Sequence, residues 1–160
     1  ENASDGPQTV VFQVPTKVKT PIPSSKPRPA RFLLFSPNHR FLVRIGVGGT
    51  SVWDIQNGKF ASEGFGLGVA TKAAFSPDGR RLLYYRMPKT EAVDNNTYGT
   101  FELIVADSDG RNPVAYGREF PWASWGPDGK QVACLTRKGI HIVDLASRKV
   151  SRTVPMLQNK

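Results

Sequence analysis

The segment Phe75-Ser76-Pro77-Asp78-Gly79 decides the fold, because two close copies of it occur elsewhere in the chain. Phe35-Ser36-Pro37-Asn38 precedes it and Trp125-Gly126-Pro127-Asp128-Gly129 follows it, so the prolines lie 40 and 50 residues apart. A fixed turn at a period of 40 to 50 residues indicates a repeat architecture. Proline presets the backbone angle of the turn, and the Asp-Gly or Asn after it tolerates a left-handed conformation. Each copy is therefore predicted to join two antiparallel strands.

Short apolar segments around these turns divide the chain into three units, at about 31–70, 71–119 and 120–156. The segments are rich in Val, Ile, Leu and Phe and are bounded by Gly, Pro, Asn or Asp, which is typical of strands and turns. Four strands are predicted in each unit: 31–35, 41–45, 50–55 and 59–63; then 71–75, 81–86, 100–106 and 113–117; then 121–125, 131–136, 139–145 and 149–154. No segment shows a helical apolar period over ten or more residues. The sequence predicts an all-β fold.

Residues 1–30 differ in composition from the repeats, which are expected to occupy 31–160. The run at 9–14 has the character of a strand. Residues 15–30 hold several prolines among Ser, Lys and Arg, and proline removes a ladder donor and favours extended chain. We therefore predict an N-terminal strand followed by a basic linker or surface arm.

The charge of the chain favours an anionic partner. Lys and Arg number 22 against 13 acidic residues, which gives a net charge of +9. The charges are dispersed, however, so a solvated surface is favoured over a nucleic-acid site. No apolar run approaches the roughly 20 residues needed to span a bilayer.

No catalytic, cofactor or metal site is predicted. His39 and His141 are the only histidines and Cys134 is the only cysteine, too few for a recognisable zinc set. Cys134 lies in an apolar stretch and is expected to be buried as a small hydrophobic residue. A serine-hydrolase elbow of the type Gly-x-Ser-x-Gly does not occur in the sequence.

The second unit resembles the TolB-type WD-like β-propeller repeat, through residues 75–84 and 103–113. The third unit is similar, except that Gly126 replaces the usual serine, and Ser51-Val52-Trp53-Asp54 resembles the end of a WD repeat. The first unit departs at Asn38-His39, where the family pattern has Asp-Gly, which puts its turn geometry in question.

The resemblance covers residues 31–154 and implies propeller blades of four antiparallel strands. About three blades are expected, whereas propellers typically close with four to eight. The chain is therefore expected to be a partial propeller, or half of a ring that a homodimer completes. In either case, the strand at 9–14 could add an outer strand to a neighbouring or terminal blade.

Propellers of this family serve as scaffolds, as periplasmic binding proteins and as substrate gates of peptidases. The resemblance therefore implies a non-enzymatic scaffold with a protein partner. Two alternatives remain open: the gating propeller of a prolyl-oligopeptidase-like serine hydrolase, and a basic propeller associated with nucleic acid or ribosomes. If the likeness extends to location, the protein would lie in the periplasm or cell envelope.

The loop at 87–99 is the one long insertion between strands, and long loops on rigid scaffolds often carry recognition. Its polar residues form the candidate partner-binding set: Lys89, Glu91, Asp94, Asn95, Asn96 and Tyr98. A tolerated, mobile loop without a binding role is the favoured reading.

Overall fold

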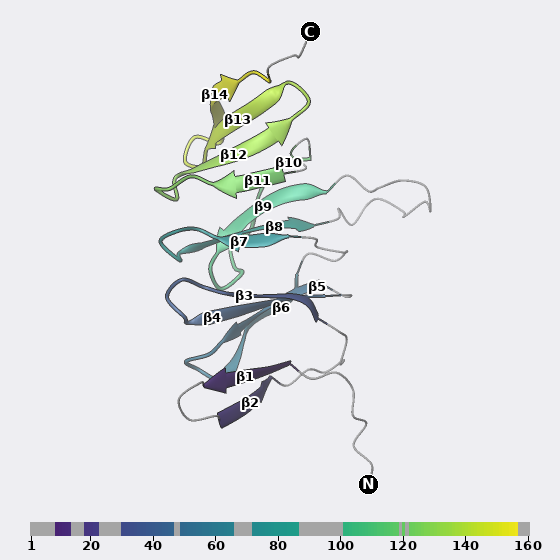
Figure 1. Ribbon diagram of the computed structural model, residues 1–160, viewed down its shortest axis with the longest axis vertical. Helices are drawn as coiled ribbons and strands as arrows, with labels where there is room; N and C mark the ends of the chain where they lie inside the picture. Colours follow the sequence, from purple (N-terminus) through teal and green to yellow (C-terminus); the bar gives the residue numbers. More distant parts are fainter. Residues whose placement is uncertain are drawn as a thin grey trace, which may run out of the picture.

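The computed structural model describes residues 9–13, 18–22, 30–46, 49–65, 72–86, 101–118, 120 and 122–156. Within these residues every regular element is a β-strand, and no helix able to cross a membrane is present. Three antiparallel sheets of four strands follow one another in chain order along the long axis of the molecule (Figure 1). This arrangement confirms the predicted all-β fold.

Each sheet is a meander whose strands pair in the order of the sequence. The first sheet contains β3 (Ala30–Phe35), β4 (Phe41–Gly46), β5 (Gly49–Asp54) and β6 (Lys59–Phe65). The second contains β7 (Ala73–Phe75), β8 (Arg81–Arg86), β9 (Glu102–Asp107) and β10 (Val114–Gly117). The third contains β11 (Trp122–Trp125), β12 (Gln131–Thr136), β13 (Gly139–Asp144) and β14 (Lys149–Val154). The ends of these strands lie within two residues of the predicted ones.

A separate hairpin precedes the first sheet and consists of β1 (Thr9–Gln13) and β2 (Val18–Ile22). The strand predicted at 9–14 is thus present, but residues 18–22 form a strand where the sequence predicted a linker. Pro21 is part of β2 and lies opposite Val10. Proline is tolerated there because both strands of a two-stranded sheet are edges, where a missing N–H need not face a partner.

The turn at Ser76 shows why its sequence is repeated. The buried Ser76 hydroxyl donates to Asp78 Oδ1 at 2.6 Å and accepts the Arg81 N–H at 2.9 Å. Asp78 Oδ1 also accepts the Arg80 N–H at 3.1 Å. Gly79 has a φ of 68°, in the left-handed region that glycine adopts without steric cost. The side chains of one tetrapeptide thus fix the start of the next strand.

The first copy keeps this geometry despite its altered sequence. Ser36 Oγ donates to Asn38 Oδ1 at 2.6 Å and accepts the Phe41 N–H at 2.9 Å. His39 has a φ of 56°, so a histidine stands in the left-handed position that Gly79 fills in the second copy. The doubt that the sequence raised about this turn is resolved in favour of the common geometry.

The sheets pack face to face through two apolar clusters. Phe41, Val43 and Ile45 of the first sheet meet Leu82, Tyr84 and Ile104 of the second. On its other face, the second sheet packs Leu83, Tyr85 and Leu103 against Val132, Cys134 and Val143 of the third. The second sheet therefore presents one face to the first sheet and the other to the third.

The first strands of the second and third sheets, β7 and β11, contact each other. The indole N–H of Trp125 on β11 donates to the Ala74 carbonyl of β7 at 3.0 Å. In a propeller, the blades are arranged radially around a central axis, so one edge of each sheet lies near that axis. A contact between the first strands of two sheets fits this arrangement.

The Ser76 hydroxyl is expected to stabilise the fold measurably. Ser76→Ala leaves the Arg81 N–H without this acceptor and removes a donor to Asp78, so the free energy of unfolding should fall by about 1–3 kcal/mol. Urea denaturation followed by tryptophan fluorescence measures the change. Ser124→Ala, an exposed serine on β11, is the control and should change stability little. Equal effects of the two substitutions would contradict the role of the turn.

The same turn should make stability depend on acid pH. The hydrogen bond from Ser76, followed by that from the Arg80 N–H, holds the pKa of Asp78 below its ordinary value of 3.8. A carboxyl whose pKa is lower in the folded state stabilises the fold above pH 3.8 and ceases to do so as the pH falls through the folded-state pKa.

Thermal melts between pH 7 and pH 2 are expected to show this loss, and Ser76→Ala should weaken the dependence. A destabilisation by Ser76→Ala that is the same at both ends of this range would contradict the coupling.

Cys134 is fully buried between the second and third sheets, as the sequence predicted, and burial raises the pKa of its thiol to about 12. Little thiolate exists at neutral pH, and none of the side chain is accessible. We expect a thiol reagent such as a disulfide dye to label Cys134 only as fast as the protein opens. The chain unfolded in urea gives the labelling rate of an accessible thiol. Labelling of the native chain at that rate would contradict the closed packing between the second and third sheets.

Candidate functional site

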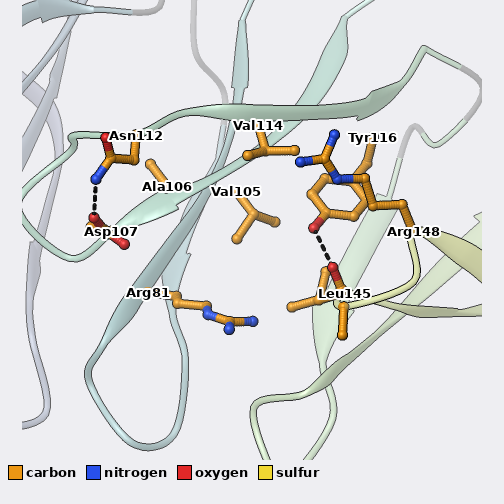
Figure 2. Close-up of a pocket in the computed structure, with 10 residues that line it drawn as sticks. Arg81, Val105, Ala106, Asp107, Asn112, Val114, Tyr116, Leu145 and Arg148 are labelled. Atoms are coloured by element: carbon orange, nitrogen blue, oxygen red, sulfur yellow. Dashed lines mark hydrogen bonds between the residues drawn. The ribbon is translucent and has the colours of Figure 1, made fainter.

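A cleft of about 290 Å³ opens at the seam between the second and third sheets (Figure 2). Strands β8, β9 and β10 form one side, and the turn between β13 and β14 forms the other. The lining residues are Arg81, Val105, Ala106, Asp107, Asn112, Val114, Tyr116, Leu145, Ala146 and Arg148. Charged and polar side chains share this lining with the aliphatic Val105, Val114 and Leu145.

Tyr116 joins the two sides of the cleft. Its hydroxyl donates to the Leu145 carbonyl at 3.0 Å, as Figure 2 shows. Burial raises the pKa of Tyr116, although the positive charges of Arg148 and Arg81 act in the opposite direction. Both arginines therefore lie close enough to influence the phenol electrostatically.

The seam between the first and second sheets has an equivalent bond. There the Ser62 hydroxyl of β6 donates to the Asp109 carbonyl, in the turn of the next sheet, at 2.6 Å. A side chain of the fourth strand thus bonds to the following sheet's turn at both seams. The second seam uses a long tyrosine where the first uses a serine.

Arg81 occupies a position that is apolar in the first sheet. It begins β8 as Phe41 begins β4, and the alternation along β8 places it on the same face as Leu83 and Tyr85. Phe41 is buried in the first seam, whereas Arg81 is exposed at the cleft. The change from phenylalanine to arginine therefore replaces an apolar contact with a charged rim.

Arg148 has an unusual backbone conformation for its residue type. Its φ is 57°, close to the 60° of Gly58, which holds the same place in the turn of the first sheet. The left-handed region costs a residue with a Cβ about 1–2 kcal/mol relative to glycine. In Figure 2 its guanidinium reaches back over the cleft toward Tyr116 and Val114.

The acidic residues beside the cleft are engaged within their own turns. Asp107 accepts a hydrogen bond from the Asn112 amide at 2.7 Å. Asp144 accepts the Ser147 N–H at 2.8 Å and the Ser147 hydroxyl at 2.7 Å. Among the described residues, no ion pair joins Arg81 or Arg148 to a carboxylate. The lining therefore carries two arginines against the one carboxylate of Asp107, an excess of positive charge.

The loop residues that the sequence singled out, Lys89, Glu91, Asp94, Asn95, Asn96 and Tyr98, lie outside the described residues. Their proposed role in partner binding stays a prediction. The sequence did not indicate that Arg81 and Tyr116 belong to one site, because they lie on different strands and no local motif joins them. One signal pointed to Arg148, since the third unit ends this turn in Ala-Ser-Arg where the first ends in Asn-Gly.

The histidines lie apart from the cleft lining. His39 is exposed in the first turn. His141 on β13 packs edge-on against Phe120, with ring centroids 6.4 Å apart. In the part of the chain that the structure describes, no group of three or more His, Cys, Asp or Glu residues could hold a metal ion.

No protein-family model matches the chain, and no curated protein matches its sequence. Solved structures do match it in fold. The tricorn protease is 17% identical over 84% of this chain and 13% of its own, with a TM-score of 0.65. The β-propeller domain of Cps50 (Swd1) from Myceliophteria thermophila is 16% identical over 98% of this chain and 55% of its own, with a TM-score of 0.56.

The comparison also includes a putative TolB from Agrobacterium tumefaciens, which bears on the resemblance seen in the sequence. It is 18% identical over 89% of this chain and 51% of its own, with a TM-score of 0.52. The chain spans little more than half of these structures at most. At such identity the likeness concerns the fold, and in fold the chain is a partial β-propeller of three four-stranded sheets with TolB-like repeats.

Proposed function

We propose that the chain is a non-enzymatic propeller scaffold that binds another protein through the uncovered face of its third sheet. The observation that carries this proposal is a row of apolar side chains that crosses all four strands. Trp122 pairs with Leu135, Leu135 with Ile140, and Ile140 with Val154. We call these four residues the open face.

The equivalent positions are buried wherever a further sheet covers them. In the first sheet Ile45 and Thr50 are 2% and 0% exposed, and in the second Tyr85 and Leu103 are 3% and 1% exposed. Leu135 and Ile140 hold the same places in the third sheet, and each is 38% exposed. A contiguous apolar row that the fold elsewhere buries is the kind of surface that another protein covers.

The first sheet exposes the complementary half of such an interface. Leu33 and Phe35 of β3 point away from the second sheet, and each is about half exposed. On the same face Leu42 and Trp53 are already buried, so the uncovered part is the first strand. A second copy could therefore place its β3 against the open face, and two copies related by a twofold axis would form two such contacts.

We therefore expect self-association, with the second copy as the partner. Light scattering over a concentration series should give a mass near twice 17.6 kDa. Ile140→Lys places a charge in the open face and should shift the mass toward that of one chain. Val150→Lys is the matched control, because Val150 is also exposed on the third sheet but pairs with Val143, on the other face.

A wild-type chain that stays monomeric at every concentration would overturn the proposal that a second copy covers the open face. Equal loss of association in the two lysine variants would overturn the assignment of the surface. Circular dichroism of both variants verifies that they remain folded.

A further inference from the structure

We infer that the cleft between the second and third sheets binds a carboxylate attached to a short apolar group, such as the C-terminal residue of a peptide. The inference concerns a different surface from the open face and does not depend on self-association. It rests on the two arginines of the rim, the aliphatic side chains between them, and the left-handed backbone of Arg148.

The charge of the rim defines the ligand as an anion. Arg81 reaches the cleft from the second sheet and Arg148 from the third, with Val105 between them (Figure 2). The neighbouring carboxylates of Asp107 and Asp144 accept hydrogen bonds from their own turns. Guanidinium groups present paired N–H donors in a planar fork that matches the two oxygens of a carboxylate.

The floor favours an anion with an apolar stem over a bare inorganic ion. Val105, Val114 and Leu145 supply aliphatic surface beneath the rim. A volume of about 290 Å³ lies at the small end of ligand pockets, so one amino-acid residue suits it better than a large cofactor. The cleft therefore fits an aliphatic group with its carboxylate at the rim.

Comparison of the three units places both arginines within the repeat. Phe41, Arg81 and Gln131 begin the second strand of each sheet, and Gly58 and Arg148 hold the same place in the last turns of the first and third sheets. Neither arginine has a structural ion pair among the described residues, and Arg148 also adopts a strained backbone. Strain retained at a cleft is a reason to look for a binding role there.

These equivalences supply the variants for the test. Arg148→Gly copies Gly58, removes one guanidinium and relieves the backbone strain, so it should not destabilise the fold. Arg81→Phe copies Phe41 and should fill the cleft with an apolar ring. Arg137→Gln is the control, because Arg137 is exposed in the turn between β12 and β13, at the opposite end of the third sheet from Arg148.

The probe is N-acetyl-leucine, titrated into the full chain labelled with ¹⁵N and followed by amide chemical shifts. We expect saturable shifts confined to the strands and turns that line the cleft. N-acetyl-leucinamide has the same stem without the charge, and inorganic phosphate has the charge without the stem. Affinity for each of these should be at least about tenfold weaker, since the amide lacks the charge-assisted hydrogen bonds and phosphate lacks the apolar contact.

Arg148→Gly and Arg81→Phe should each weaken N-acetyl-leucine binding by about tenfold or more, whereas Arg137→Gln should leave it within about twofold. Equal binding of the amide would show a merely apolar cleft, and equal or tighter binding of phosphate would show a site for charge alone. Either result overturns the inference, as do absent shifts or an equal effect of Arg137→Gln. Unchanged thermal stability of the variants excludes loss of folding as the cause.

Discussion

The buried serine hydroxyl of the Ser-Pro turn is the contact on which the ends of the first two sheets depend. It accepts the N–H of the first residue of the next strand, Phe41 or Arg81, at 2.9 Å, and donates to the carboxylate or amide oxygen two residues on. A buried hydroxyl with both kinds of bond leaves little freedom in the turn. The register between the first and second strands follows from it.

The constraint extends to the second turn at the same end of each sheet. The carbonyls of Arg40, Arg80 and Lys130 accept the N–H groups of Ile55, Ser108 and Leu145 at 2.9–3.0 Å. The third sheet keeps this link although Gly126 has no hydroxyl, because the backbone bond from Gly126 to Gln131 is also retained at 2.8 Å. The serine therefore reinforces a backbone arrangement that glycine can also adopt.

This network also positions the cleft. The Ser76 hydroxyl accepts the N–H of Arg81, and the Lys130 carbonyl accepts the N–H of Leu145. The two sides of the cleft thus stand on rigid turns, and the bond from Tyr116 to Leu145 fixes their separation. Sites on such supports keep their geometry better than sites on free loops.

The local parts of this structure were predictable from the sequence, and the relations between units were not. The turn and the apolar segments are short-range signals, so the strand ends were located within two residues. Leu135 lies near the end of a short strand segment as Ile45 does, so no local pattern tells an open face from a covered one. The cleft could not be predicted because Arg81, Tyr116 and Arg148 come together only when two sheets pack. Strand β2 was not predicted because proline, here Pro21, is compatible with a strand only at an edge.

A repeat makes differences between units informative, because they show which residues the same backbone accepts at one place. Phe41 and Gly58 of the first unit hold the places that Arg81 has in the second unit and Arg148 in the third. The turns hold the same backbone in both units, so the side chains can change without a change of fold. Exposure of a charged residue in place of a buried phenylalanine forgoes about 1.5–3 kcal/mol of apolar burial, and a left-handed arginine adds about 1–2 kcal/mol. Arg148 thus keeps at the cleft a backbone strain that Gly58 avoids in the first unit, and strain at a cleft is a reason to look for a function there.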